Sequence, residues 1–367
     1  MKILVVVTSH FGYDGISNVA SNYYVYQDHS RIKMDLVTIN KIPVKLKTEF
    51  ENNGDQSYVL PQRNKNPLIY IHSLAKLIRQ KNYDIVHIHG NSCTMFIELF
   101  AAILGGCKIR IAHSHNTKCD HVIINNLLRP FFRLSYTNGF ACGIEAGKWL
   151  FNDDEFKVIS NGVDLKRFVL NREIRNTLKK ELNVDGRIVI GHVGRFSKQK
   201  NHKKLISIFS CIKKHIHNAT LLMWGEGELM PQIKDLAKNI GGDIRFMGTS
   251  NKIEKFLQVV DIVIFPSLYE GLPLFLIEAQ SLGLPCLLSD TVSPYAKITD
   301  YVYFQSLEAS NEDWARKTFE ILSVSKVENN AEKAHSYIRN AGYDIRTNSE
   351  KLFQIYKQLI KMRLCKK

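Results

Sequence analysis

The first residues able to do chemistry follow a short apolar run at Ile188–Val193. Arg195 comes just past the predicted carboxyl end of that strand, and Lys200 comes just before a segment with helical periodicity. Two cations and the backbone N–H groups of such a loop can point at one position, which suits a diphosphate. A solvated basic loop is the plainer interpretation of the same residues, because surface Lys and Arg are common.

A second candidate follows the apolar run Ile262–Phe265 and contains two carboxylates eight residues apart, Glu270 and Glu278. Pro273 suits the first turn of a helix, so the N–H groups of Leu274 and Phe275 should lack acceptors and form an anion site at its positive end. Carboxylates accept hydrogen bonds from hydroxyl groups, so sugar or ribose hydroxyls are natural partners. The plainer alternative makes Glu270 a helix cap and Glu278 a surface residue.

Histidines form a third candidate, at the end of a strand in the first half of the chain. His115 could act as a base or donate a hydrogen bond to substrate. His113 and His115, with Cys119 and His121 nearby, could instead bind zinc, or be plain core or loop histidines. Their spacing matches no standard ligand pattern, so we expect no metal. Gly15, after the first strand, could allow close approach of the backbone to a ligand.

Charge and motifs limit the other function classes. The 367 residues hold 50 Lys and Arg against 35 Asp and Glu, a net charge of +15 that invites a polyanion. The excess is spread along the chain and no zinc-finger or RNA-recognition pattern occurs, so nucleic-acid binding is disfavoured. The sequence has no P-loop and no nucleophile elbow, and Gly225-Glu226-Gly227 lacks the third glycine of a dinucleotide fingerprint.

Short apolar runs alternate with helical periodicity throughout, the pattern of β-α-β units around a parallel sheet. We expect an α/β fold of two doubly wound, Rossmann-like domains facing a central cleft. Residues 1–170 would form the first domain and residues 171–345 the second. Residues 346–367 would form an amphipathic helix that packs back toward the first domain. No apolar stretch is long enough to span a bilayer, and seven scattered cysteines suggest a reducing, cytoplasmic environment.

Several of these segments together resemble the family 4 retaining glycosyltransferases of GT-B fold, found in bacterial capsule and exopolysaccharide synthesis. The resemblance covers nearly the whole chain and is most specific from residue 191 to residue 290. It implies that residues 1–170 are the acceptor-side domain and residues 171–345 the nucleotide-sugar-binding domain. The segments that carry it are Gly194-Arg195 with Lys200-Asn201, Gly225-Glu226-Gly227, Phe246-Met247-Gly248, the Glu270-x7-Glu278 pair, Asp84 to Gly90, Arg110 to Thr117, and Ile159 to Asp164.

The resemblance implies a role for each group around the donor diphosphate. Arg195 and Lys200 would neutralise it, the amides of Leu274 and Phe275 would add helix-end contacts, and Gly15 would lie in the loop beside it. The family usually has paired glycines in that loop, whereas this chain has Tyr13-Asp14-Gly15.

The same resemblance assigns the sugar contacts. Glu278 would bind the ribose hydroxyls, while Glu270 and His115 would be the catalytic residues, at the donor sugar and near the transferred sugar. The acidic motif reads Glu-Gly-Leu-Pro where the family has Glu-x-Phe-Gly, although the offset between the two glutamates is kept.

The expected activity is therefore transfer of a sugar, with retention, from a nucleotide-diphospho-sugar to a saccharide or lipid-linked saccharide acceptor, with no metal and no cofactor. Basic residues beside apolar ones suggest a peripheral contact with the anionic cytoplasmic face of the inner membrane. The basic residues are Lys76, Arg79, Lys81, Arg129 and Arg133, and the apolar ones are Leu127, Leu128, Phe131 and Phe132. Two alternatives stay open. One is a GT-B-like nucleotide-sugar 2-epimerase, and the other is a basic nucleic-acid-binding protein.

Overall fold

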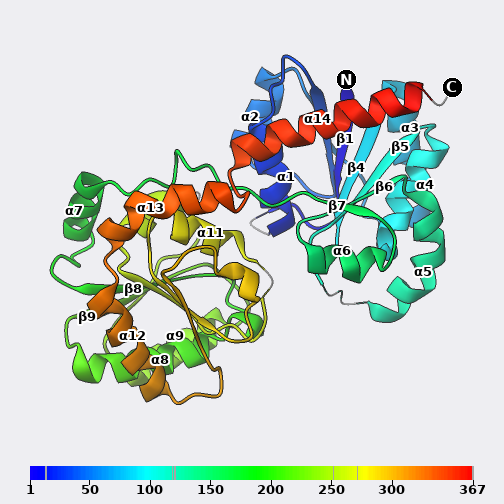
Figure 1. Ribbon diagram of the computed structural model, residues 1–367. Coiled ribbons are helices and arrows are strands. Elements are labelled where there is room, and N and C mark those ends of the chain that lie inside the picture. The colour runs from blue at the N-terminus through cyan, green and yellow to red at the C-terminus, as the bar shows by residue number, and fades with distance from the viewer. Residues whose placement is uncertain (13–14, 118, 120, 251, 271, 366–367) are drawn as a thin grey trace. The chain divides into compact units, whose positions relative to one another are not determined.

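The computed structural model describes residues 1–12, 15–117, 119, 121–250, 252–270 and 272–365. The chain divides into two units (Figure 1). Unit 1 comprises Met1–Gly162 and Ile345–Lys367, and unit 2 comprises Val163–Asp344. The chain therefore leaves unit 1 once and returns to it once.

Unit 1 is built on a parallel sheet of seven strands in the order β3-β2-β1-β4-β5-β6-β7. Its central strands, β1 and β4, are almost wholly buried, as strands covered by helices on both faces must be. After Lys2, β1 is entirely apolar, whereas β4 includes His87 and His89. The strands are β1 (Lys2–Val7), β2 (Lys33–Thr38), β3 (Ser57–Val59), β4 (Ile85–Gly90), β5 (Ile109–Ser114), β6 (Asn138–Ala141) and β7 (Phe156–Val158). The helices are α1 (Gly15–Val25), α2 (Val44–Asn52), α3 (Pro67–Lys81), η1 (Cys93–Met95), α4 (Phe96–Leu104), α5 (Val122–Ser135) and α6 (Ile144–Phe151).

Unit 2 repeats this plan with a parallel sheet of six strands in the order β10-β9-β8-β11-β12-β13. The strands are β8 (Ile188–Val193), β9 (Ala219–Trp224), β10 (Asp243–Phe246), β11 (Ile262–Phe265), β12 (Cys286–Ser289) and β13 (Val302–Gln305). The helices are α7 (Arg172–Glu181), η2 (Lys198–Lys200), α8 (His202–His215), α9 (Met230–Ile240), α10 (Ile253–Phe256), η3 (Leu257–Val259), α11 (Leu274–Ser281), η4 (Pro294–Ala296), α12 (Asn311–Val324) and α13 (Val327–Asn340).

The strand order reverses once in each sheet, between β1 and β4 in unit 1 and between β8 and β11 in unit 2. The two doubly wound, Rossmann-like units expected from the sequence are thus confirmed. In such sheets, ligands bind outside the carboxyl ends of the strands at the point of reversal. For unit 2, this directs attention to the loops after β8 and β11.

The last helix, α14 (Ile345–Leu364), packs on unit 1, as expected. Its buried face includes Leu352, Phe353 and Tyr356, and it contacts α1. The Tyr356 hydroxyl lies 2.6 Å from Nδ1 of His87 on β4, so a polar contact joins this helix to the centre of the sheet.

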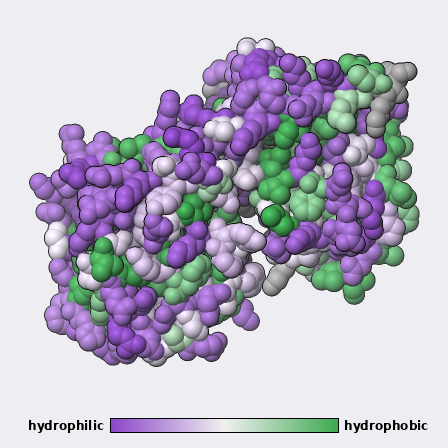
Figure 2. Space-filling model, in the orientation of Figure 1, coloured by the Kyte–Doolittle hydropathy of each residue, from purple (hydrophilic) through white to green (hydrophobic). Residues whose placement is uncertain are grey.

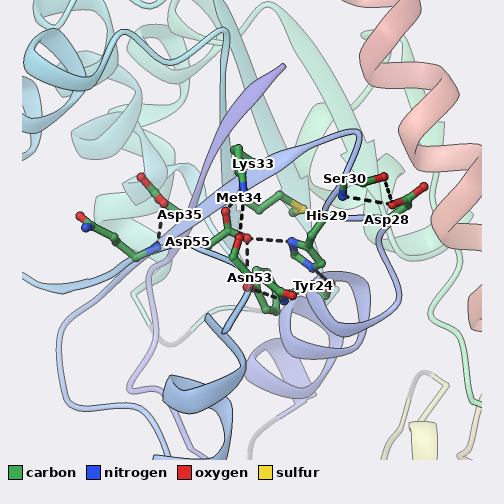
Figure 3. Close-up of polar contacts among 10 residues, drawn as sticks. Tyr24, Asp28, His29, Ser30, Lys33, Met34, Asp35, Asn53 and Asp55 are labelled. Atoms are coloured by element: carbon green, nitrogen blue, oxygen red, sulfur yellow. Dashed lines mark hydrogen bonds and ion pairs between the residues drawn. The ribbon is translucent and has the colours of Figure 1, made fainter. Parts of the chain in front are cut away.

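A buried carboxylate fixes the edge of the unit 1 sheet (Figure 3). Asp55, which precedes β3, has a side chain with no exposed surface. It accepts hydrogen bonds from the Tyr24 hydroxyl at 3.0 Å and the Met34 N–H at 3.2 Å, and His29 Nδ1 lies 2.7 Å away. These contacts tie α1 and β2 to the segment that leads into β3.

Within the described ranges, no helix combines the length and the apolar character needed to cross a bilayer.

Candidate active site

Glycines bring the loop after β8 against the loop after β9. A Cβ on Gly225, whose φ is +137°, would lie 2.0 Å from the carbonyl oxygen of Gly194. A Cβ on Gly227 would lie 2.5 Å from the oxygen of Phe196. The Gly194 N–H donates to the backbone carbonyl of Trp224 and the Phe196 N–H donates to the backbone carbonyl of Glu226, each at 3.0 Å. In the sequence, Gly225 and Gly227 belong to an incomplete dinucleotide motif and to the family resemblance, and in the fold they let the two loops approach closely, which holds the Arg195 loop in place.

A buried ion pair joins the loops that follow β8 and β11. Lys200 Nζ lies 2.6 Å from Oε1 of Glu270, and the two side chains are only 15% and 10% exposed. The Lys200 ammonium also lies 4.6 Å from the centre of the Phe265 ring. Beside the pair, the Leu268 N–H donates to the Gln199 carbonyl at 2.8 Å. The two residues assigned to the diphosphate and the donor sugar are therefore direct neighbours at the point of strand reversal.

Arg195 lies in a different environment. Its side chain is 74% exposed and forms an ion pair with Glu228, with Nη2 3.2 Å from the carboxylate. An exposed pair of this kind contributes at most about 1 kcal/mol. The guanidinium can thus exchange Glu228 for an incoming phosphate at little cost.

Helix α11 begins at Leu274, with Pro273 as its N-cap at φ −64° and ψ 132°. Proline has no N–H, so the first donors at this helix end belong to Leu274 and Phe275. The first N–H groups of a helix have no acceptor within the helix, and the helix dipole makes this end positive. The N–H groups of Leu274 and Phe275 at the positive end of α11 therefore suit a negatively charged oxygen such as that of a phosphate.

Glu278 lies in the middle of α11 and is half-buried. Burial raises the pKa of its carboxyl group from 4.5 to about 7, an effect that Arg167 opposes and Glu254 reinforces. Arg167 and Glu254 themselves form an ion pair at 2.9 Å. The carboxyl group is therefore poised between its protonated and ionised forms near neutral pH, in the absence of a hydroxyl partner that would favour the ion.

In unit 1, His115 follows β5 and belongs to a cluster of four histidines. Its Nε2 lies 2.9 Å from Nδ1 of His89 on β4. Burial lowers the pKa of His115 to about 3 and also lowers the pKa values of His87, His89 and His113, so all four rings are neutral at pH 7. Proximity along the chain had suggested only Cys119 and His121 as companions of His113 and His115. His87 and His89 could have been found from their two-residue spacing on a predicted strand, because that spacing puts both rings on one face.

Two comparisons show the family. Residues 173–342, nearly all of unit 2, match the family model described as "Glycosyl transferases group 1". EpsF of Bacillus subtilis, which carries a glycosyltransferase name, is 30% identical over 97% of this chain and 96% of its own. The chain belongs to the group 1 glycosyltransferases.

One further relative and one solved structure are similar to this glycosyltransferase. The UDP-Gal:alpha-D-GlcNAc-diphosphoundecaprenol alpha-1,3-galactosyltransferase of Escherichia coli is 27% identical over 75% of this chain and 76% of its own. The fold matches that of HepE from Anabaena, solved in complex with UDP-glucose, with a TM-score of 0.78 and 16% identity over 98% of this chain and 100% of that one. The GT-B fold is thereby confirmed, and nothing in these comparisons favours an epimerase or a nucleic-acid-binding protein.

The predicted site residues of the glycosyltransferase divide between the units. Unit 2 holds Arg195, Lys200, Glu270, Leu274, Phe275 and Glu278, and of these the structure pairs Lys200 with Glu270 directly. Unit 1 holds His115 and Gly15. Gly15 is the exposed first residue of α1, with open space where a Cβ would lie. The preceding Tyr13 and Asp14, which depart from the family pattern, lie outside the described residues.

Proposed function

We propose that this glycosyltransferase transfers a sugar, with retention of anomeric configuration, from a UDP-sugar to a saccharide or lipid-linked saccharide in surface polysaccharide synthesis. The observation that carries the proposal is the buried Lys200–Glu270 pair at the strand reversal of unit 2, in the stretch that leads to the amino end of α11. The UDP-glucose complex of HepE and the lipid-linked substrate named for the E. coli relative support the choice of substrates.

The leaving diphosphate is the group that unit 2 stabilises. Breaking the bond between the anomeric carbon and the diphosphate oxygen leaves negative charge on the phosphate. Lys200, shielded from solvent, and Arg195, held only by an exposed pair, supply positive charge, and the amides of Leu274 and Phe275 add fixed donors. These groups neutralise the diphosphate without a metal ion.

The two glutamates hold hydroxyl groups at either end of the donor. Glu278 accepts hydrogen bonds from the ribose, and these bonds favour its ionised form, lowering the raised pKa of the free protein. Glu270 binds hydroxyls of the transferred sugar. When Lys200 turns to the phosphate, the Glu270 carboxylate needs new donors, and sugar hydroxyls supply them.

His115 acts on the transferred sugar as a neutral imidazole. The ring stays uncharged at neutral pH because burial lowers its pKa, and Nε2 is engaged by His89 at 2.9 Å. It therefore serves as a hydrogen-bonding group for the sugar. Gly15, which has no side chain, lets the backbone approach the donor closely.

We further propose that unit 1 contacts the cytoplasmic face of the inner membrane through α4 and α5. Figure 2 shows apolar surface at the side of unit 1 where α4 and α5 lie. Contiguous apolar patches of this kind mark interaction surfaces. The exposed apolar residues of the two helices are Phe100, Ile103, Leu104, Val122, Ile123, Ile124, Leu127, Phe131 and Leu134.

The sequence suggested a membrane contact through both basic and apolar residues, and the structure supports it mainly through exposed apolar surface. Phe132, which the sequence suggested as part of the surface, is fully buried in the core. Arg133 is paired with Asp154 at 2.5 Å, and Arg129 donates to the carbonyl of Leu150 at 3.0 Å. Part of the basic charge is thus already satisfied within unit 1.

Flotation with vesicles that contain anionic phospholipid tests the membrane contact. The wild-type chain should float with the vesicles, and Leu127→Asp with Leu134→Asp should reduce the floating fraction several-fold. Val324→Asp, at an exposed apolar residue of unit 2, is the matched control and should have no effect. Equal flotation of wild type and the double variant would exclude α5 as the contact.

Incubation with a panel of UDP-sugars and GDP-sugars, with and without a lipid-linked saccharide, tests the activity. We expect release of UDP and an α-linked product by NMR only when the acceptor is present. An altered free nucleotide-sugar without acceptor would show an epimerase instead. An inverted product would refute the retaining mechanism.

A further inference from the structure

We propose that unit 1 contains a zinc site formed by His87, His89 and His113. One ring nitrogen from each of the three residues lies within 4.8 Å of the other two. All three side chains are buried, with at most 2% of each residue exposed. This site is separate from the groups assigned to the donor diphosphate and ribose in unit 2.

The register of the neighbouring strands β4 and β5 explains why the three imidazoles of His87, His89 and His113 meet on one face of the sheet. His87 and His89 are two residues apart on β4 and therefore project from the same face of the sheet. His89 is paired with His113 of the neighbouring β5. The ring centre of His113 lies 5.2 Å from that of His87 and 4.9 Å from that of His89.

The distances suit a common ion after small ring rotations. Nε2 of His87 lies 3.1 Å from Nδ1 of His113. Two nitrogens bound to one tetrahedral Zn²⁺ at about 2.0–2.1 Å would lie about 3.3 Å apart. The remaining separations, up to 4.8 Å, must close by about 1.5 Å, which rotation of buried rings about χ2 can supply.

Hydrogen bonding within the cluster leaves one ring atom unsatisfied. Nε2 of His113 is buried and has no hydrogen-bond partner among the described residues. The Tyr356 hydroxyl contacts Nδ1 of His87, and Nε2 of His87 contacts Nδ1 of His113. Neither contact involves Nε2 of His113, so within the part of the chain that the structure describes it has no partner for any choice of tautomers. An unsatisfied buried polar atom costs about 1–3 kcal/mol, so hydrogen bonding alone does not account for this cluster of rings.

The Tyr356 hydroxyl supplies the outer contact that a metal-binding histidine normally has. It lies 2.6 Å from Nδ1 of His87, on the side of the ring away from His113. When Nδ1–H donates to this oxygen, Nε2 carries the lone pair and faces the cluster. The zinc ion would thereby link β4, β5 and, through Tyr356, helix α14.

The ligand chemistry selects the class of metal. Three neutral imidazoles favour Zn²⁺ and its neighbours Cu²⁺, Ni²⁺ and Co²⁺ over Mg²⁺ and Ca²⁺, which prefer oxygen. Three protein ligands leave a fourth coordination position open. The sequence alone had offered Cys119 and His121 as possible zinc ligands beside His113. In the site proposed here, the ligands beside His113 are instead His87 and His89.

Metal content of the purified full-length chain, with any histidine tag removed, tests the proposal. After incubation with ZnCl₂ and dialysis into metal-free buffer, the wild-type chain should retain about one zinc per chain. His113→Gln should reduce the retained zinc at least tenfold. His335→Gln, at a half-buried histidine of unit 2, is the matched control and should retain the wild-type amount.

A measurement on the wild-type chain alone covers the case in which His113→Gln does not fold. X-ray absorption of the zinc-loaded chain should show nitrogen scatterers at about 2.0 Å with imidazole outer-shell features. Sulfur scatterers at about 2.3 Å would place the zinc on cysteines and overturn the proposal. Retention of less than a tenth of an equivalent by wild type, or equal retention by His113→Gln, would show that the histidines form only a hydrogen-bonded chain. Both measurements read the zinc directly, so their outcome can be told apart from that of the transferase assay.

Discussion

Glu278→Gln should make unit 2 more stable while weakening donor binding. Burial raises the pKa of Glu278 from 4.5 to about 7, so the folded protein holds this proton more tightly than the unfolded chain does. Between pH 4.5 and pH 7 the folded state binds more protons, and stability therefore falls as pH rises through that window. At about 1.4 kcal/mol per pKa unit, the full cost above pH 7 is about 3 kcal/mol, and solvent access to the half-buried side chain reduces it to about 1–3 kcal/mol.

Intrinsic fluorescence during thermal unfolding measures this effect. Two of the three tryptophans, Trp224 and Trp314, are buried in unit 2 and report its unfolding. Glu278→Gln should unfold several degrees above wild type at pH 8, and the difference should shrink toward zero near pH 5. Glu181→Gln, at an exposed glutamate of α7, is the matched control and should follow wild type at both pH values.

The same variant should bind UDP about tenfold or more weakly, because a neutral amide accepts weaker hydrogen bonds from the ribose than a carboxylate does. Greater stability with weaker binding is the combination expected of a site residue that is costly to bury. A midpoint difference that does not change with pH, or a variant less stable than wild type at pH 8, would refute this reasoning about Glu278.

Three other predictions concern buried contacts. Lys200→Met should cost about 3 kcal/mol because it leaves the Glu270 carboxylate unpaired, and Lys200→Met with Glu270→Met should recover most of that stability in urea denaturation. Asp55→Ala removes three buried contacts and should destabilise unit 1 by about 3 kcal/mol, seen as earlier loss of amide protection in β2; unchanged protection would contradict this. Gly225→Ala places a Cβ 2.0 Å from a backbone oxygen and should abolish UDP binding by calorimetry. Gly186→Ala shares the strain of a positive φ (+67°) but has nothing within 4 Å of the new Cβ, and this control should bind UDP normally.

Much of the fold could be predicted because its signals are local. Buried strands such as Ile188–Val193 and Ile262–Phe265 appear as apolar runs, and the helical periodicity between them indicates parallel β-α-β connections. The last helix also packs on unit 1 as expected. Edge strands were harder: β13, at Val302–Gln305, has only four residues and is only partly buried, so it lacks the long apolar run that marks the central strands.

The candidate site was predicted less completely because its contacts are non-local. Lys200 and Glu270 belong to separate sequence motifs, and only the adjacency of β8 and β11 makes them an ion pair. The meeting of His89 with His113 likewise depends on strand register, which spacing along the chain does not encode. The raised pKa of Glu278 arises from burial by distant segments and is also invisible in the local sequence.

Titration of UDP into the wild-type chain and into Lys200→Met by calorimetry tests the central claim, that unit 2 binds the donor diphosphate beside the Lys200–Glu270 pair. A charge-assisted hydrogen bond contributes about 1.5–3 kcal/mol, so we predict a dissociation constant about 10- to 100-fold higher for the folded variant. Uridine, which lacks the diphosphate, should bind both proteins equally. Equal affinity of the two proteins for UDP would contradict the account.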